Sequence, residues 1–265
     1  PDRPSSSNGE SVTDPLHVTE SIALNWLRRG GKRFRPFVTL AAYAALTEGP
    51  RALRPGSAPS IGIPDGVKYA ALAIEALHKA SLVHDDIEDE DAYRYGRPTL
   101  HREHGVSTAL NVGDYLIGLG YRLVSSVREE FGAECAADIL THLSGSHLKL
   151  TRGQGAELLW AADTTGGPTA SEVQAVYALK TAPAFEAALY AGIRLAQSRV
   201  DGNTGDVSMS GIRRFCRYLG AAYQVKNDLR DWEAGENDKV VSGQDVLSDR
   251  PTILQAFALG PDGEE

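Results

Sequence analysis

Residues 78–101 read HKASLVHDDIEDEDAYRYGRPTLH and follow an apolar, alanine-rich stretch, Val67–Val83. Six of the seven residues from 85 to 91 are acids. Asp85 and Asp89 are four positions apart, so on a helix their carboxylates share one face and repel each other unless a cation lies between them. Mg²⁺ suits such a pair, because it keeps several waters and takes only one or two protein carboxylates. The stretch therefore predicts either a magnesium site at the end of a central helix or a solvated acidic helix end.

A second acidic cluster favours the metal interpretation. Asn227, Asp228 and Asp231 lie 142 positions beyond the first cluster, in the last strong helical pattern of the chain. An amide oxygen can ligate a hard cation, although it brings no negative charge. Two such clusters indicate that two helices grip one metal-bound ligand from opposite sides.

A basic turn lies near the start of the chain. Residues 30–36 read GGKRFRP and precede an apolar helical pattern. Lys32 and Arg35 are three positions apart and converge if the helix has begun by then. Two convergent cations at a glycine turn suit a diphosphate, and a solvated basic helix start is the alternative.

Composition limits the class of protein. The chain has 265 residues, 42% of them apolar, and a net charge of −8, which argues against non-specific nucleic-acid binding. Its apolar runs are too short for a transmembrane segment, and no signal segment opens the sequence. The two cysteines, Cys135 and Cys216, give no disulfide framework and no metal-site spacing. A cytoplasmic protein is therefore expected.

The apolar pattern predicts an all-α fold. Apolar residues recur at intervals of three and four, breaks fall at glycine and proline clusters, and alternating strand patterns are nearly absent. We expect residues 1–15 to be a disordered tail and residues 16–265 to form a single domain of roughly eight to ten helices. The expected helices are His17–Leu27, Phe37–Leu46, Val67–Val83, Ala109–Val127, Cys135–Ala162, one with Ser171 as its N-cap, and Gly211–Trp232.

Five motifs in order carry a resemblance to a known family. They are GKRFRP (31–36), EALHKASLVHDDIED (75–89), RYGRPTLH (94–101), LKTAPAF (179–185) and YQVKNDLRD (223–231). Over roughly Arg28–Phe257 the chain resembles the trans-isoprenyl diphosphate synthases, also called the polyprenyl synthetase family. The resemblance implies a helical bundle of the isoprenoid-synthase type around a central cavity, usually as a homodimer. It also implies Mg²⁺-dependent condensation of an allylic diphosphate with isopentenyl diphosphate.

The resemblance assigns roles position by position. The metal ligands that it implies are Asp85, Asp89, Asn227, Asp228 and Asp231. The catalytic groups that it implies are Asp85, Asp89, Arg94, Lys180, Asp228 and Lys239. Contacts to the allylic diphosphate fall to Arg94, Lys180, Thr181 and Lys239, and those to isopentenyl diphosphate fall to Lys32, Arg35 and His78. Gln224 matches the glutamine before the second acidic motif, and without the resemblance His78 reads as a core histidine.

The sequence departs from the family pattern at the isopentenyl diphosphate site and in the second acidic cluster. Tyr95 stands where the family has an arginine that contacts isopentenyl diphosphate, and Asn227 stands where it has an aspartate. Loss of a charged, bidentate contact costs about 1.5–3 kcal/mol, or about ten- to a hundredfold in affinity. The sequence also ends at Glu265, earlier than the resemblance implies, so a shortened C-terminal region is expected.

Small residues before the first acidic pair bear on product length. The family blocks the growing chain with bulky residues four and five positions before this pair, where this sequence has Ser81 and Ala80. A product of C20 or longer is therefore expected.

Three other functions remain open from the sequence. The departures fit a terpene-cyclase-like or non-standard prenyl-coupling enzyme, and a non-catalytic partner subunit is a further possibility. His84 followed by Asp85 superficially fits a metal phosphohydrolase, which needs more histidines at metal spacing than we can place. Lys180 within an apolar helix is costly to bury unpaired, so an anion is expected beside it.

Overall fold

The computed structural model describes residues 14–49, 52, 54, 62–162, 167–200, 207–231 and 252–259. These residues form ten helices and one two-stranded ladder, which confirms the predicted all-α class. The helices are α1 (Pro15–Arg28), α2 (Phe34–Thr47), α3 (Asp65–Glu88), α4 (Leu100–His104), α5 (Val106–Ser126), α6 (Arg128–Phe131), α7 (Ala133–Ala162), α8 (Ala170–Gln197), α9 (Met209–Asp231) and α11 (Ile253–Leu259). Among them, none combines the length and the apolar character that a membrane crossing requires.

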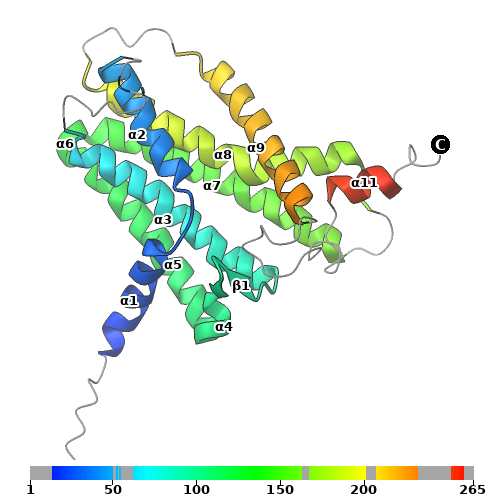
Figure 1. Cartoon of the computed structure of the whole chain (residues 1–265). Helices are drawn as coiled ribbons and strands as arrows, with labels where there is room; N and C mark the ends of the chain where they lie inside the picture. The colour runs from blue at the N-terminus through cyan, green and yellow to red at the C-terminus, as the bar shows by residue number, and fades with distance from the viewer. Residues whose placement is uncertain are drawn as a thin grey trace, which may run out of the picture.

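Helix α3 lies at the centre of the bundle (Figure 1). It packs against α5 on one side and against α2 and α8 on the other, while α7 and α9 each pack along α8. A short antiparallel hairpin follows α3, with β1 (Tyr93–Arg94) paired to β2 (Arg97–Pro98). The acidic end of α3 therefore meets the hairpin and the C-terminal part of α9 at one end of the bundle.

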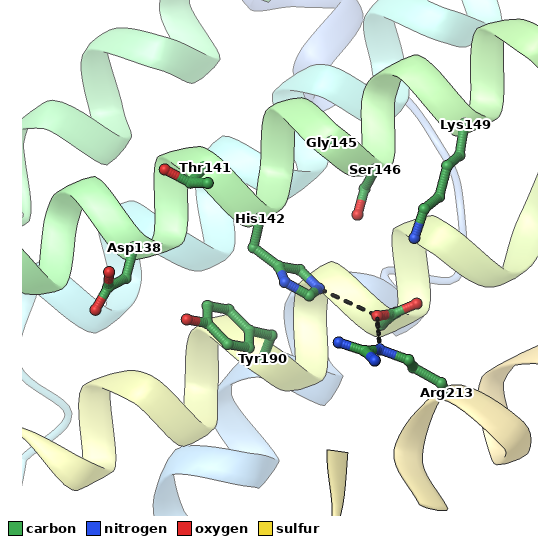
Figure 2. Close-up of a pocket in the computed structure, with 9 residues that line it drawn as sticks. Asp138, Thr141, His142, Gly145, Ser146, Lys149, Tyr190 and Arg213 are labelled. Carbon is green, nitrogen blue, oxygen red and sulfur yellow. Dashed lines mark hydrogen bonds and ion pairs between the residues drawn. The ribbon is translucent and has the colours of Figure 1, made fainter. Parts of the chain in front are cut away.

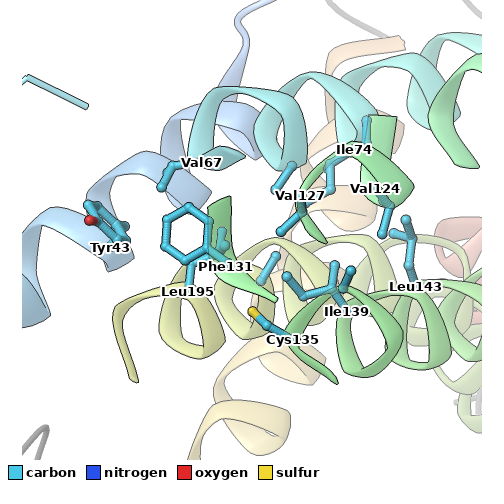
Figure 3. Close-up of a cluster of buried hydrophobic side chains, with 14 of the residues drawn as sticks. Tyr43, Val67, Ile74, Val124, Val127, Phe131, Cys135, Ile139, Leu143 and Leu195 are labelled. Carbon is cyan, nitrogen blue, oxygen red and sulfur yellow. The ribbon is translucent and has the colours of Figure 1, made fainter. Parts of the chain in front are cut away.

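Two apolar clusters hold α3 in place. The larger cluster joins α2, α3, α5, α6, α7 and α8 (Figure 3), and the ring of Tyr43 packs edge-on against that of Phe131 at 6.4 Å between centroids. The second cluster joins α1, α3, α4 and α5 around Trp26 and Leu116. Burial raises the pKa of the Cys135 thiol and raises that of Cys216 to about 11, so both remain protonated thiols.

Side-chain caps define where two helices start. Asp14 caps α1 by accepting from the Leu16 amide at 3.0 Å, and Pro15 occupies the first helical turn, so these two residues belong to the helix and not to the predicted tail. Residues 1–13 lie outside the described part of the chain. Helix α8 begins with a capping box between Thr169 and Glu172, so the expectation of Ser171 as N-cap was wrong.

Close packing of α2 on α8 depends on Gly192. A Cβ atom at this position would lie 2.4 Å from the carbonyl oxygen of Thr39 and 2.8 Å from the Cβ of Ala42. Gly155 on α7 is the opposite case, because a Cβ there would meet nothing within 4 Å.

We predict that Gly192→Ala destabilises the protein by about 1–3 kcal/mol, because backbone and not a flexible side chain blocks the added methyl group. The matched control Gly155→Ala should stabilise it by about 0.5–1 kcal/mol through helix propensity alone. Urea unfolding measures both changes. Equal stability changes in the two variants would contradict the close approach of α2 and α8.

Candidate active site

One cavity of about 510 Å³ brings most of the predicted site residues together. The predicted residues on its wall are Lys32, Arg35, His78, Ser81, Asp85, Asp89, Arg94, Tyr95, Lys180, Thr181, Gln224, Asn227 and Asp228. Asp231 is the last residue of α9 and its side chain is not described, while Lys239 lies outside the described residues. Ala80 is not on this wall, because it is buried in the second apolar cluster.

The cavity is acidic where α3 ends, and earlier along the helix it has an apolar part beside the polar Glu75 and His78. Ile74 and Leu77 line it earlier along α3, and Asp85 and Asp89 line it where the helix ends. Helix rise places Ile74 about 16 Å from Asp85 along the axis. Leu143 of α7 lines the apolar part and belongs to the larger core cluster. The hollow can therefore hold a molecule with a charged head and an apolar tail.

The acidic run divides between the cavity and the hairpin. Asp85 and Asp89 line the cavity, and no hydrogen bond or ion pair from the described residues reaches the Asp85 carboxylate. Burial, with a contribution from the charge of Asp89, raises the pKa of Asp85 to about 7 against the opposing charge of Lys180. A cation bound nearby would stabilise the charged form of this carboxylate.

Asp86 and Asp91 hold Arg94, a role that the sequence analysis missed. The guanidinium of Arg94 donates through Nε to Asp86 and through Nη2 to Asp91 at 3.3 Å, and both carboxylates are buried. Burial lowers the pKa of Arg94, but the charge of Asp86 and its hydrogen bond outweigh burial and raise it. The hairpin thus presents a fixed cation to the cavity.

His78 orients Arg35. Burial, reinforced by the charge of Arg35, lowers the pKa of His78 well below its ordinary value, so the imidazole is neutral. Its Nε2 then accepts from Arg35 Nη1 at 2.9 Å, and the guanidinium lies 5.0 Å from the centroid of the Phe185 ring. The adjacent Arg33 is paired with buried Glu75 at 2.5 Å and donates to the Leu27 carbonyl. Of these two arginines, Arg35 is the one oriented by a neutral partner.

Lys180 has the anionic partner that its burial required. Its ammonium pairs with Glu157 of α7, which also lines the cavity. Thr181 accepts through Oγ1 from Gln224 Nε2 at 2.8 Å, which links α8 to α9. Sequence reasoning could not identify Glu157, because nothing in its local pattern marks the lysine that it contacts 23 residues away.

Asp228 is held at the junction of three helices. Its Oδ2 accepts from the Tyr177 hydroxyl at 2.5 Å and from the Ile253 amide at 3.3 Å. Burial and the Asp228 carboxylate raise the pKa of Tyr177, so its hydroxyl remains a donor. Tyr177 is a second site residue without a sequence signal, and it fixes the direction of the Asp228 carboxylate.

A smaller pocket of about 270 Å³ opens between α7, α8 and α9 (Figure 2). His142 stacks on Tyr190 with ring centroids 4.0 Å apart, and Glu186 accepts from Arg213 at 3.2 Å. None of the residues singled out by the sequence lines this pocket. The larger cavity is therefore the candidate active site.

Comparison with known proteins gives the family. The polyprenyl synthetase family model matches residues 17–265. The chain belongs to the polyprenyl synthetase family. It is 30% identical to farnesyl diphosphate synthase of Bacillus subtilis, over 93% of this chain and 79% of that protein. The family match and this relative show that the chain is a trans-prenyltransferase. This result confirms the class of enzyme expected from the motifs.

Solved structures of the same family confirm the isoprenoid-synthase fold. The geranylgeranyl pyrophosphate synthetase of Pyrococcus horikoshii superposes with a TM-score of 0.74 at 29% identity, over 94% of this chain and 69% of that one. A polyprenyl synthase from Caulobacter crescentus, complexed with calcium and isoprenyl diphosphate, gives a TM-score of 0.73 at 25% identity, over 95% and 68%.

We predict that Asp86→Asn weakens the fixation of Arg94. The variant removes one of the two buried carboxylates that hold Arg94 and leaves it with Asp91 alone, so the unfolding free energy should fall by about 3 kcal/mol, and the KM for an allylic diphosphate should rise. Urea unfolding and steady-state kinetics measure the two effects. The control Glu90→Gln removes an exposed acid from the same run and should change stability by less than about 0.5 kcal/mol. An Asp86→Asn protein as stable as that control would contradict the ion pair.

Proposed function

We propose that this enzyme condenses an allylic diphosphate with isopentenyl diphosphate in a Mg²⁺-dependent reaction that yields a trans-prenyl diphosphate. The observation that carries the proposal is the single cavity, in which carboxylates from α3 and α9 and cations from α8 and the hairpin meet an apolar wall. Three buried polar atoms of lining residues, Arg35 Nε, His84 Nε2 and Gln154 Oε1, have no hydrogen-bond partner in the described part of the chain. A polar ligand in the cavity would satisfy them.

The residues present fit magnesium. Among the described residues no three metal-ligating side chains cluster, and Mg²⁺ needs only one or two carboxylates when water and phosphate oxygens complete its shell. Asp85 and Asp89 would hold the ion from one wall, and Asn227 and Asp228 would hold it from the other, while Asp231 is assigned as a ligand by the resemblance alone. When bound, Mg²⁺ neutralises the charge that grows on the departing diphosphate.

Side chains of the protein supply the other interactions that ionisation of the allylic diphosphate requires. Arg94 and Lys180, each fixed by a carboxylate, donate to the allylic diphosphate, and Thr181 and Lys239 complete this contact. The apolar wall keeps water from the allylic cation until the double bond of the acceptor reaches it. The released diphosphate is the base that removes the final proton, so no separate catalytic base is required.

The acceptor diphosphate is assigned to the loop before α2 and to the first turn of that helix. Lys32 and Arg35 line the cavity beside Tyr95, and no acidic partner of Lys32 occurs among the described residues. His78 supports this contact by orienting Arg35 and need not touch the diphosphate itself. The neutral Tyr95 leaves this side of the cavity with less positive charge than the family pattern supplies.

The apolar end of the cavity supports a product of C20 or longer. Ser81 lines the cavity four positions before Asp85, and the small side chains of Ala184 and Ala187 line it from α8. No bulky side chain stands at position 81 to stop a growing chain.

A homodimer and a cytoplasmic location complete the proposal. Exposed leucines on α5 and α7, among them Leu110, Leu140 and Leu148, support the binding of a second copy of the chain. The two free buried cysteines favour a reducing compartment.

One assay tests the proposed reaction. Purified protein with Mg²⁺ and each of the C5 to C20 allylic diphosphates is incubated with and without isopentenyl diphosphate, and products are read by mass spectrometry. We expect elongated diphosphates only when isopentenyl diphosphate is present. Diphosphate release without the acceptor would indicate a cyclase or another coupling reaction, and no release at all would indicate a non-catalytic subunit.

We predict that Asp85→Ala abolishes turnover in this assay, with at least a hundredfold loss. Its helical content by circular dichroism should be unchanged, because the carboxylate makes no contact that the fold requires. Activity near that of the parent enzyme would show that Asp85 does not hold the metal.

We predict that Ser81→Phe shortens the main product by at least one isoprene unit, because the ring would project from the same face of α3 as Asp85. The control Ser81→Ala keeps the space open and should keep the parent product. Mass spectrometry of the products distinguishes them, and an unchanged chain length in Ser81→Phe would refute this boundary of the cavity.

A further inference from the structure

Lys79 is the most unusual polar residue of α3, because its side chain is completely buried. Its ammonium donates to the carbonyl oxygens of Arg29 at 2.6 Å and Gly30 at 3.4 Å. No carboxylate of the described residues lies within ion-pair distance of it. A buried ammonium with only carbonyl oxygens as hydrogen-bond acceptors is costly, so its other contacts need to be identified.

Two aromatic rings complete the surroundings of Lys79. The ammonium lies 4.2 Å from the centroid of the Tyr95 ring and 5.1 Å from that of Trp26, at distances where a cation is attracted to an aromatic face. Trp26 also donates from its indole nitrogen to the Lys79 carbonyl at 3.0 Å. Tyr95, the residue that replaces the family's arginine, thus binds a buried cation.

These contacts fix the turn that leads into α2. Gly30 and Gly31 both adopt positive φ angles, and a Cβ atom at Gly30 would lie 2.5 Å from the Tyr95 ring. Tyr95 therefore covers the turn, and Lys79 binds the same turn through its carbonyls. The next residue, Lys32, lines the cavity, whereas Lys79 does not.

We propose that Lys79 is a positioning residue for the acceptor diphosphate, which it serves by tying the Gly30–Gly31 turn to α3 and holding the Tyr95 ring over that turn. The inference rests on the proposed function for the identity of the acceptor. The ammonium sits behind the turn and adds positive charge on a side of the cavity where Tyr95 brings none. Lys79 acts through Lys32 and the turn without touching the substrate.

The charge of Lys79 is sensitive to pH. Burial, together with the charges of Arg33, Arg94 and Arg29, lowers its pKa to about 8 against the opposing charge of Glu75. As pH rises through 8, the folded protein loses this proton and the interaction with both rings weakens, so the KM for the acceptor should rise. The unfolded chain keeps the proton to higher pH, so stability itself should not fall over this range.

The test compares Lys79→Met, which removes the charge, with Lys79→Arg, which keeps it. We expect Lys79→Met to raise the KM for isopentenyl diphosphate about tenfold, to leave the KM for the allylic diphosphate within twofold, and to abolish the rise of acceptor KM above pH 8. Lys79→Arg should restore the acceptor KM at least in part. Lys68→Met, at an exposed position of the same helix, is the matched control and should change none of these values.

Equal effects of Lys79→Met on both substrates, or no effect on either, would overturn the inference. Hydrogen–deuterium exchange of the amides from 29 to 33 provides a readout that does not need turnover. Faster exchange there in Lys79→Met than in Lys68→Met supports the positioning role even if the enzyme proves not to use isopentenyl diphosphate. Unchanged exchange overturns it, whatever the outcome of the condensation assay.

Discussion

The rest of the site depends on the partners that buried polar side chains of α3 find outside the helix. Glu75 pairs with a guanidinium, His78 accepts from another, Lys79 binds the turn before α2, and Asp86 holds the arginine of the hairpin. Each buried group would be costly alone. The partners of these groups lie in the segments that surround the cavity, so the same contacts hold those segments in place. The stability of α3 and the geometry of the site therefore have the same origin.

Asp85 departs from this rule, and the departure indicates chemistry. Asp86 and Glu88 on α3 have protein partners, whereas no described residue bonds to the Asp85 carboxylate, and burial favours its protonated form. Lys180 is already neutralised by Glu157. Such a cavity has fixed cations and a carboxylate that lacks a counter-charge. A metal ion and a diphosphate entering together would supply the missing charges.

Much of the fold was predictable, because it depends on local patterns. The 3.6-residue period gave the helices, and the spacing of Asp85 and Asp89 gave their shared face. The same geometry explains why Ser81 lines the cavity and Ala80 does not. A residue four positions back lies about 40° around the helix, whereas one five positions back lies about 140° away. Glu157 and Tyr177 could not be predicted, because their partners come from distant helices.

The state of the two cysteines has a practical consequence. Cys135 and Cys216 are both buried in apolar clusters, and both are protonated thiols. Maleimides and similar reagents react with an accessible thiolate. The two cysteines of the folded enzyme should therefore react with them only very slowly. A cysteine introduced on the surface would then be the dominant labelling position. Fluorophores or spin labels could then report on ligand binding without a cysteine-free background.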